Sequence, residues 1–285
     1  ITAILPVGDS LFIGTEKGLC IYDIKSKKST NIFAETDTLV LPDNHIFYIN
    51  EPVFNRIVIC TKGGTSIYDL KKKTFEIPKI PNYSPEYEAH CIQYVEYDNS
   101  WWIGTSNGLV RYHEDNLSLR HLYHIEDVEQ TLPDNNLRCM HRVDDTMIFI
   151  GTSDGLCQLN AVDQTLNRID LNALTNYRSP KTDVSKIISL DENKIMVSTY
   201  TDGLYIYDYK ENIAIHISKF DKRDAISDNY IFDVFKDVNG SVWIATFRYH
   251  HLQEPHRHRR RGHLRTHHLP GTRYLHLQDR RVCNP

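Results

Sequence analysis

The chain has 285 residues, of which 40% are hydrophobic, and a formal net charge of −4. No apolar run approaches the roughly 18–20 residues of a membrane helix, so we expect this segment to make no membrane contact. The charge is divided unevenly: residues 1–247 carry −11 and residues 248–285 carry +7, the latter with nine arginines, no lysine and eight histidines. The sequence begins at Ile1 inside a strand-like segment, which indicates a mature or excised piece of a longer protein.

One motif recurs along residues 1–247. It reads IGTEKGLCIYD at 13–23, ICTKGGTSIYD at 59–69, IGTSNGLVRYH at 103–113, IGTSDGLCQLN at 150–160 and VSTYTDGLYIYD at 197–208, and it begins again as WIAT at 243–246. Its threonines are spaced by 46, 44, 47, 47 and 47 residues, at Thr15, Thr61, Thr105, Thr152, Thr199 and Thr246. A repeat of this period indicates equivalent structural units.

A second motif precedes most copies of the first. It reads LPDNHIFYI at 41–49, LPDNNLRCM at 132–140 and AISDNYIFDV at 225–234, with a looser relative, TDVSKIISL, at 182–190. Each unit then divides into four short alternating strands; in the third unit they are 91–97, 101–105, 109–113 and 117–123. Four antiparallel strands at this period are typical of propeller blades, whereas the turns of a parallel β-helix are much shorter.

We therefore predict an all-β fold, a β-propeller of four-stranded antiparallel blades with about five complete blades and a partial sixth. The predicted blades cover about 1–40, 41–85, 86–131, 132–181, 182–224 and 225–247. The repeat stops in mid-blade after Phe247, and we interpret residues 248–285 as an aberrant His/Arg-rich tail, disordered or frameshifted; the alternative is a natural basic tail.

Cysteine and tryptophan positions follow the same repeat. None of the six cysteines forms a C-x-x-C pair, and Cys20 and Cys157 occupy equivalent strand positions, so we predict free buried thiols. Trp102 and Trp243 share one register and predict packing between blades. Trp101 lies one residue earlier, on the opposite sheet face, and we expect it in the core.

These residues carry a family resemblance. The pattern is clearest at Asp237–Thr246, Trp101–Tyr112 and Leu41–Ile46, and it resembles the two-component regulator propeller repeat. That resemblance implies a fragment of a seven-bladed ring within a periplasmic sensor domain. The parent would be an inner-membrane histidine kinase that detects an oligosaccharide and self-associates or dimerises, and this segment would be its non-catalytic input domain.

Ligands of propellers usually meet the edge where the connections between strands two and three, and between strands four and one, come together. Residues there that differ between copies are free to specialise. On this basis we predict these ligand-binding candidates: Lys17, His45, Lys62, Asn107, Asp154, Arg178 and Tyr200.

Other functions have weaker support in the sequence. A propeller lyase or hydrolase would need converging acids, histidines or a metal, but the seven histidines of residues 1–247 do not recur in one register. We therefore predict no catalytic residue, metal or cofactor, and no nucleic-acid binding through the arginines at 257 and 259–261. A protein-interaction scaffold without a small ligand remains the main alternative.

Overall fold

The computed structural model describes residues 1–34, 41–77, 88–113, 115–221 and 225–247, and the backbone of 272–277. The chain divides into two compact units, unit 1 (Ile1–Ile169) and unit 2 (Asp170–Pro285). The described part is all-β apart from two short helical turns, η1 (Glu96–Asp98) and α1 (Leu171–Thr175). This confirms the predicted fold class of antiparallel propeller blades.

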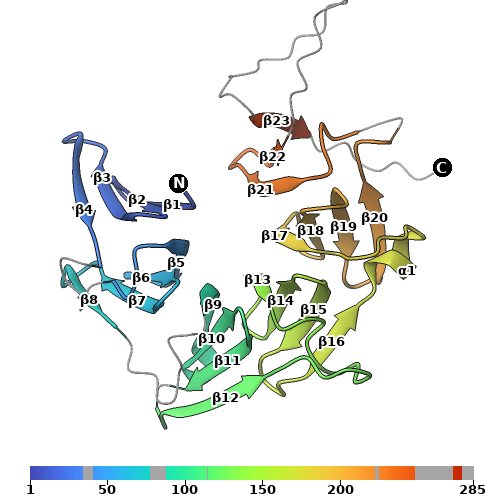
Figure 1. The fold of residues 1–285 in the computed structure, drawn as a ribbon, viewed down its shortest axis with the longest axis horizontal. Coiled ribbons are helices and arrows are strands. Elements are labelled where there is room, and N and C mark those ends of the chain that lie inside the picture. The colour runs from blue at the N-terminus through green and yellow to red at the C-terminus, as the bar shows by residue number, and fades with distance from the viewer. Residues whose placement is uncertain (35–40, 78–87, 114, 222–224, 248–271, 278–285) are drawn as a thin grey trace, which may run out of the picture. The chain divides into compact units, whose positions relative to one another are not determined.

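Unit 1 contains four sheets, each a meander of four antiparallel strands in chain order (Figure 1). Sheet 1 consists of β1 (Ala3–Val7), β2 (Ser10–Thr15), β3 (Gly18–Asp23) and β4 (Lys28–Ile32). Sheet 2 consists of β5 (Ile46–Val53), β6 (Arg56–Thr61), β7 (Gly64–Asp69) and β8 (Thr74–Glu76). Sheet 3 consists of β9 (Ala89–Val95), β10 (Ser100–Thr105), β11 (Gly108–His113) and β12 (Ser118–Leu122). Sheet 4 consists of β13 (Leu137–Arg142), β14 (Met147–Thr152), β15 (Gly155–Asn160) and β16 (Leu166–Ile169).

Unit 2 contains two sheets. Sheet 5 consists of β17 (Val184–Ser189), β18 (Lys194–Thr199), β19 (Leu204–Asp208) and β20 (Ile213–Ile217). Sheet 6 has three strands, β21 (Ile231–Lys236), β22 (Val242–Phe247) and β23 (Thr272–Leu277). The sequence predicted no strand beyond Phe247, but β23 pairs antiparallel with β22. The rest of the predicted disordered or frameshifted tail, 248–271 and 278–285, lies outside the described residues.

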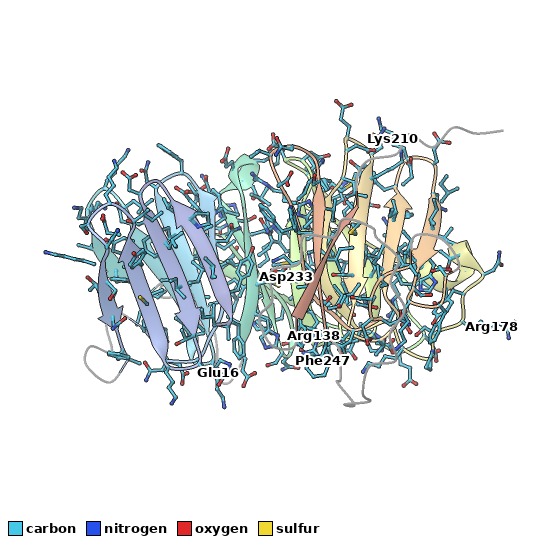
Figure 2. All side chains as sticks on the ribbon, turned by 90° about the horizontal axis from the view of Figure 1, so that it is seen from above. Glu16, Arg138, Arg178, Lys210, Asp233 and Phe247 are labelled. Atoms are coloured by element: carbon cyan, nitrogen blue, oxygen red, sulfur yellow. The ribbon has the colours of Figure 1, made fainter. Side chains whose placement is uncertain are left out.

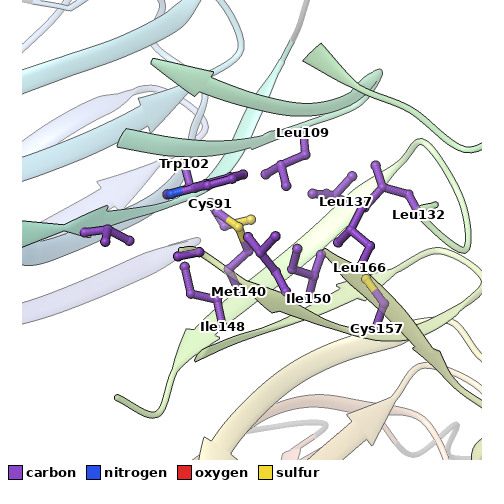
Figure 3. Close-up of a cluster of buried hydrophobic side chains, with 13 residues drawn as sticks. Cys91, Trp102, Leu109, Leu132, Leu137, Met140, Ile148, Ile150, Cys157 and Leu166 are labelled. Carbon is purple, nitrogen blue, oxygen red and sulfur yellow. The ribbon is translucent and has the colours of Figure 1, made fainter. Parts of the chain in front are cut away.

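The hydrophobic core lies between consecutive sheets. Figure 3 shows it between sheets 3 and 4, where Trp102 and Leu109 meet Leu137, Met140 and Ile150. All six residues of β10 are buried, because a sheet is packed on each of its faces, whereas β12 at the outer side alternates between exposed and partly buried residues. Stacking of the sheets buries apolar side chains that a single sheet would expose to solvent.

Three core predictions can be compared with the structure. Trp102 and Trp101 are buried as predicted, with 0% and 3% of their surfaces exposed. Cys60, Cys91, Cys139 and Cys157 form no disulfide and are buried, but Cys20 is only partly buried. Cys283 lies outside the described residues. Trp243, predicted to pack between blades, is 39% exposed.

Candidate ligand-binding face

The T-x-x-G turns between the second and third strands are held by their own threonines. Thr105 Oγ1 donates a hydrogen bond to the Gly108 carbonyl at 2.8 Å and accepts one from the Asn107 N–H at 3.0 Å. Gly108 has φ +98°, and a Cβ there would lie 2.6 Å from the Leu122 carbonyl oxygen, so only glycine fits. The same hydroxyl-to-carbonyl bond recurs at Thr15, Thr61, Thr152 and Thr199.

An asparagine just before sheets 2, 4 and 6 joins the turn of the preceding sheet to the sheet that follows. The Asn135 carbonyl accepts from the Gly108 N–H at 2.6 Å, and its Oδ1 accepts from the His124 N–H at 2.7 Å. Asn44 and Asn229 make the same pair of bonds to the sheets that precede them. We call this arrangement the asparagine clip. It fixes the backbone of one edge of the sheets, which we call the turn face.

A β-bulge lies just after each clip. The pairing of first and second strands shifts by one residue in sheets 2 to 6, and no such shift occurs in sheet 1. The residues skipped by the shift differ in type: Phe47, His90, Arg138, Ser185 and Phe232. Because each follows a fully buried apolar residue, the packing constrains the backbone while the bulged side chain is free to vary.

The bulges of sheets 2 and 3 begin a mixed polar and aromatic cluster in unit 1. The Phe47 and His90 rings pack in a T-shaped arrangement with their centroids 4.9 Å apart, and the centroids of the His45 and Phe47 rings are 4.6 Å apart. His90 Nδ1 donates to the Leu137 carbonyl oxygen at 2.7 Å, because a carbonyl can only accept. Its Nε2 is 3.5 Å from Glu88 Oε2, and Lys62 Nζ is 4.0 Å from Glu88 Oε1.

Two of the predicted candidates in unit 1 therefore lie together. The Lys62 N–H donates to the His45 carbonyl at 2.9 Å, which places both beside Phe47 and Glu88. Lys17 and Asp154 are exposed and Asn107 is half-buried, each in the turn of a different sheet.

In unit 2 the turn face carries four aromatic side chains. Phe232, the bulged residue of sheet 6, lies 4.9 Å from Tyr230 and 5.6 Å from Phe247 between ring centroids. The predicted candidate Tyr200 joins them, 5.2 Å from Tyr230 and 6.4 Å from Phe232. Tyr230 is 40% exposed and Phe232 46% exposed, so this aromatic cluster meets solvent.

The predicted candidate Arg178 lies apart from these aromatic rings. It is exposed on the connection between α1 and β17. Figure 2 shows Arg178 and Phe247 toward the lower edge of unit 2, and Lys210, from the turn between its third and fourth strands, at the upper edge. The sequence did not anticipate α1, whose first turn is capped by Asp170 through the Ala173 N–H at 2.9 Å.

Sequence reasoning missed most of the two clusters, namely Phe47, Glu88, His90, Tyr230, Phe232 and Phe247. Most of these residues share a position in the repeat and differ in residue type. The residue after the motif asparagine and the residue two further on flank a buried apolar residue, as His45 and Phe47 flank Ile46. Aligning the motifs and reading those two columns would have found the bulged side chains.

The described residues hold no group of three or more His, Cys, Asp or Glu side chains that could bind a metal. In the same part of the chain, no helix is both long and apolar enough to cross a bilayer. The turn face offers a Lys–Glu–His array with Phe47 in unit 1 and a cluster of aromatic rings in unit 2. Each cluster by itself suits binding of a polar ligand by stacking and hydrogen bonds.

Residues 225–248, which cover the clip and first two strands of sheet 6, match the family model described as two component regulator propeller. The sixth repeat is thus similar to the two component regulator propeller repeat. No curated protein sequence matches the chain. Regulator propeller repeats thus account directly for 225–248, and the equivalent motifs at 41–69 and 132–160 extend the pattern along the chain.

Solved structures with the same fold include an extracellular domain from B. thetaiotaomicron, assigned to the putative hybrid two component system BT3049. It is 23% identical with a TM-score of 0.70, over 85% of this chain and 31% of that one. The computationally designed protein Ika8 is 13% identical with a TM-score of 0.54, over 86% of this chain and 67% of that one. The chain thus spans about a third of the length of the bacterial domain.

Proposed function

We propose that this chain is a non-catalytic, extracytoplasmic input domain of a two-component signalling protein and that its turn face binds an oligosaccharide. The regulator propeller repeat at 225–248 and the shared fold with the extracellular domain from B. thetaiotaomicron support the sensor role. In the parent protein the domain would lie in the periplasm, joined through a membrane anchor to a histidine kinase.

The turn face is the observation that carries this proposal. Sheets 2 to 6 each have a bulge beside a threonine turn or an asparagine clip, and in sheets 2, 3, 4 and 6 the bulged side chain is not fully buried. In unit 2 the aromatic faces of Tyr230 and Phe232 suit the C–H surface of a sugar ring, and in unit 1 Glu88, His90 and Lys62 can hydrogen-bond to hydroxyls. A preformed face of this kind loses little conformational entropy when a ligand binds.

Signalling adds a further requirement. A ligand changes the output only if it binds one conformation of the receptor more tightly than another, so tight binding alone is not enough. A ligand on the turn face would touch residues from successive sheets. It would therefore favour the arrangement of sheets that matches its own shape.

The test is binding of the full chain to a glycan array, followed by calorimetry with any sugar that binds. We expect His90→Ala to weaken binding at the cluster of unit 1, and Tyr230→Ala to weaken binding at the cluster of unit 2, each by about tenfold or more, as central contact residues do. The control is Lys210→Ala, at the opposite edge, which should change affinity less than about twofold. Absence of glycan binding, or capture of a soluble protein through the same face, would replace the sugar-sensor proposal with a scaffold.

A further inference from the structure

Three nitrogen atoms on one face of sheet 3 are buried without a hydrogen-bond partner among the described residues, namely Trp102 Nε1, Arg111 Nε and His113 Nδ1. Trp102 pairs directly with Arg111 across β10 and β11, and His113 follows Arg111 two residues later, so the three side chains share one face. Figure 3 shows Trp102 in the cluster that packs between this face and sheet 4. Buried polar atoms nearly always have a partner, so three without one on a single face indicate a bound group.

The chemistry of these atoms requires an acceptor. An indole N–H and an arginine Nε–H can only donate, and a histidine Nδ1 donates in one of its two neutral tautomers. Trp102 is 0% exposed, and the guanidinium carbon of Arg111 lies 5.5 Å from the centre of a ring of Trp102. The two obligate donors are therefore neighbours, and water from outside does not reach the indole.

Sheet 4 presents an apolar surface to these donors. Ile148, Leu159 and Leu166 lie in the same cluster as Trp102, and they pair with one another across β14, β15 and β16. Each of the three is at most 3% exposed. Their side chains are hydrocarbon and cannot accept a hydrogen bond, and surroundings of this kind strengthen the attraction between a charge and its counter-ion.

The charges near the three donors favour an anion. Arg111 lies directly opposite Arg120 across β11 and β12, so two guanidinium groups share this face. Arg111 Nη2 binds Asp98 Oδ2, whereas Arg120 Nη1 donates to the uncharged amide oxygen of Gln164 at 2.6 Å. Like charges directly opposite each other destabilise a strand pair, and a bound anion would offset that cost.

We propose that a small monovalent anion such as chloride binds between sheets 3 and 4 and accepts hydrogen bonds from Trp102 Nε1, Arg111 Nε and His113 Nδ1. A halide ion only accepts, whereas a water molecule would also have to donate its two protons to acceptors. The anion stabilises the folded chain, because the three donors come together only there. This proposal does not depend on the sugar binding proposed for the turn face.

Unfolding of the full chain in sodium chloride, compared with sodium gluconate at equal ionic strength, tests the site. An anion that binds only the folded chain lowers the unfolding equilibrium constant about tenfold at about ten times its dissociation constant, and the effect follows a binding curve. Trp102→Phe removes the indole N–H but keeps an aromatic ring, and it should abolish the chloride dependence. The matched control is Trp101→Phe, at a buried position on the opposite face of the sheet, which should keep that dependence.

Anomalous diffraction from crystals of the full chain soaked in sodium bromide locates the anion without any variant. A bromide peak within hydrogen-bond distance of both Trp102 Nε1 and Arg111 Nε is the expected result. A position without bromide, whether it holds an ordered water or no density, would overturn the proposal. A chloride dependence that Trp102→Phe retains would also overturn it, because the stabilising anion would then bind elsewhere.

Discussion

At the scale of single residues, the asparagine clip explains why the L-P-D-N motif contains an aspartate followed by an asparagine. Its aspartate accepts from a backbone N–H two residues on, as Asp134 does from Asn136 at 2.7 Å. Its asparagine binds the preceding sheet through both backbone and side chain. The aspartate forms the Asx turn, and the asparagine side chain that follows it bonds to the preceding sheet, so the motif needs these two residue types in this order.

Replacing Asn135 by alanine should destabilise the fold by about 1–2 kcal/mol, because the half-buried His124 N–H loses its acceptor. Asn135→Asp keeps an oxygen at that place and should recover most of the loss. The control is Asn116→Ala, which removes an exposed local bond to the Ser118 N–H and should cost less than about 0.5 kcal/mol. Urea unfolding of the three variants measures the difference; equal losses at Asn135 and Asn116 would show that the clip adds nothing.

At the scale of elements, the bulge separates the packing of a strand from the choice of one side chain. Deleting His90 would give β9 and β10 the continuous pairing seen between β1 and β2, with Ala89 and Cys91 keeping their partners. We expect this variant to fold with a loss of about 1–2 kcal/mol, the size of a typical single-residue change, and to lose turn-face binding.

Deletion of Ile92, two residues further on, is the matched control. It shifts the rest of β9 by one residue and turns its buried side chains to the opposite face, so it should prevent folding. Circular dichroism and thermal unfolding compare the two deletions. If both unfold the chain equally, the bulge is not an insertion into an otherwise regular strand pair.

The contrast between strands and bulges also explains what the sequence could predict. Alternation and turn residues specified the strands of sheets 1 to 5, because burial on both faces demands apolar residues such as Ile103 and Val110 at fixed spacing. The ligand candidates were chosen from turn tips, and only Lys62, His45 and Tyr200 fell in a cluster. Contacts such as Phe47 with His90 join neighbouring repeats, and no spacing within one repeat reveals them.

At the scale of the whole molecule, aspartates cap hairpins in both units. The pKa values of Asp23, Asp69, Asp144, Asp163 and Asp191 lie below the ordinary value of 3.8. For Asp144, burial raises the pKa, but the hydrogen bonds from the Thr146 and Met147 N–H groups and the Thr146 hydroxyl, together with the charge of Arg142, lower it by more. Asp23 and Asp69 accept hydrogen bonds from the Ser26 and Lys71 N–H groups and so cap the turns that follow the third strands.

Because these folded-state pKa values are depressed, the carboxylates stabilise the fold above about pH 4, and that contribution is lost as the pH falls through the folded values. We expect the free energy of unfolding to drop between about pH 5 and about pH 2.5. Asp144→Asn should flatten this drop, whereas Glu126→Gln, at an exposed carboxylate, should not. Urea titrations at several pH values measure the slope; identical slopes for all three chains would contradict the assignment.

The asparagine clip has a consequence for synthesis on the ribosome. The turn that ends at Gly108 obtains its carbonyl partner from Asn135, and the turn at Gly18 obtains its partner from Asn44, so these two sheets are completed by chain that is translated later. In the nascent chain the glycine N–H of such a turn therefore lacks its carbonyl partner until the next repeat has been translated. Assembly would proceed from the N-terminus in steps of one repeat. A pause in translation before a clip asparagine would leave the preceding sheet without the two hydrogen bonds of its clip.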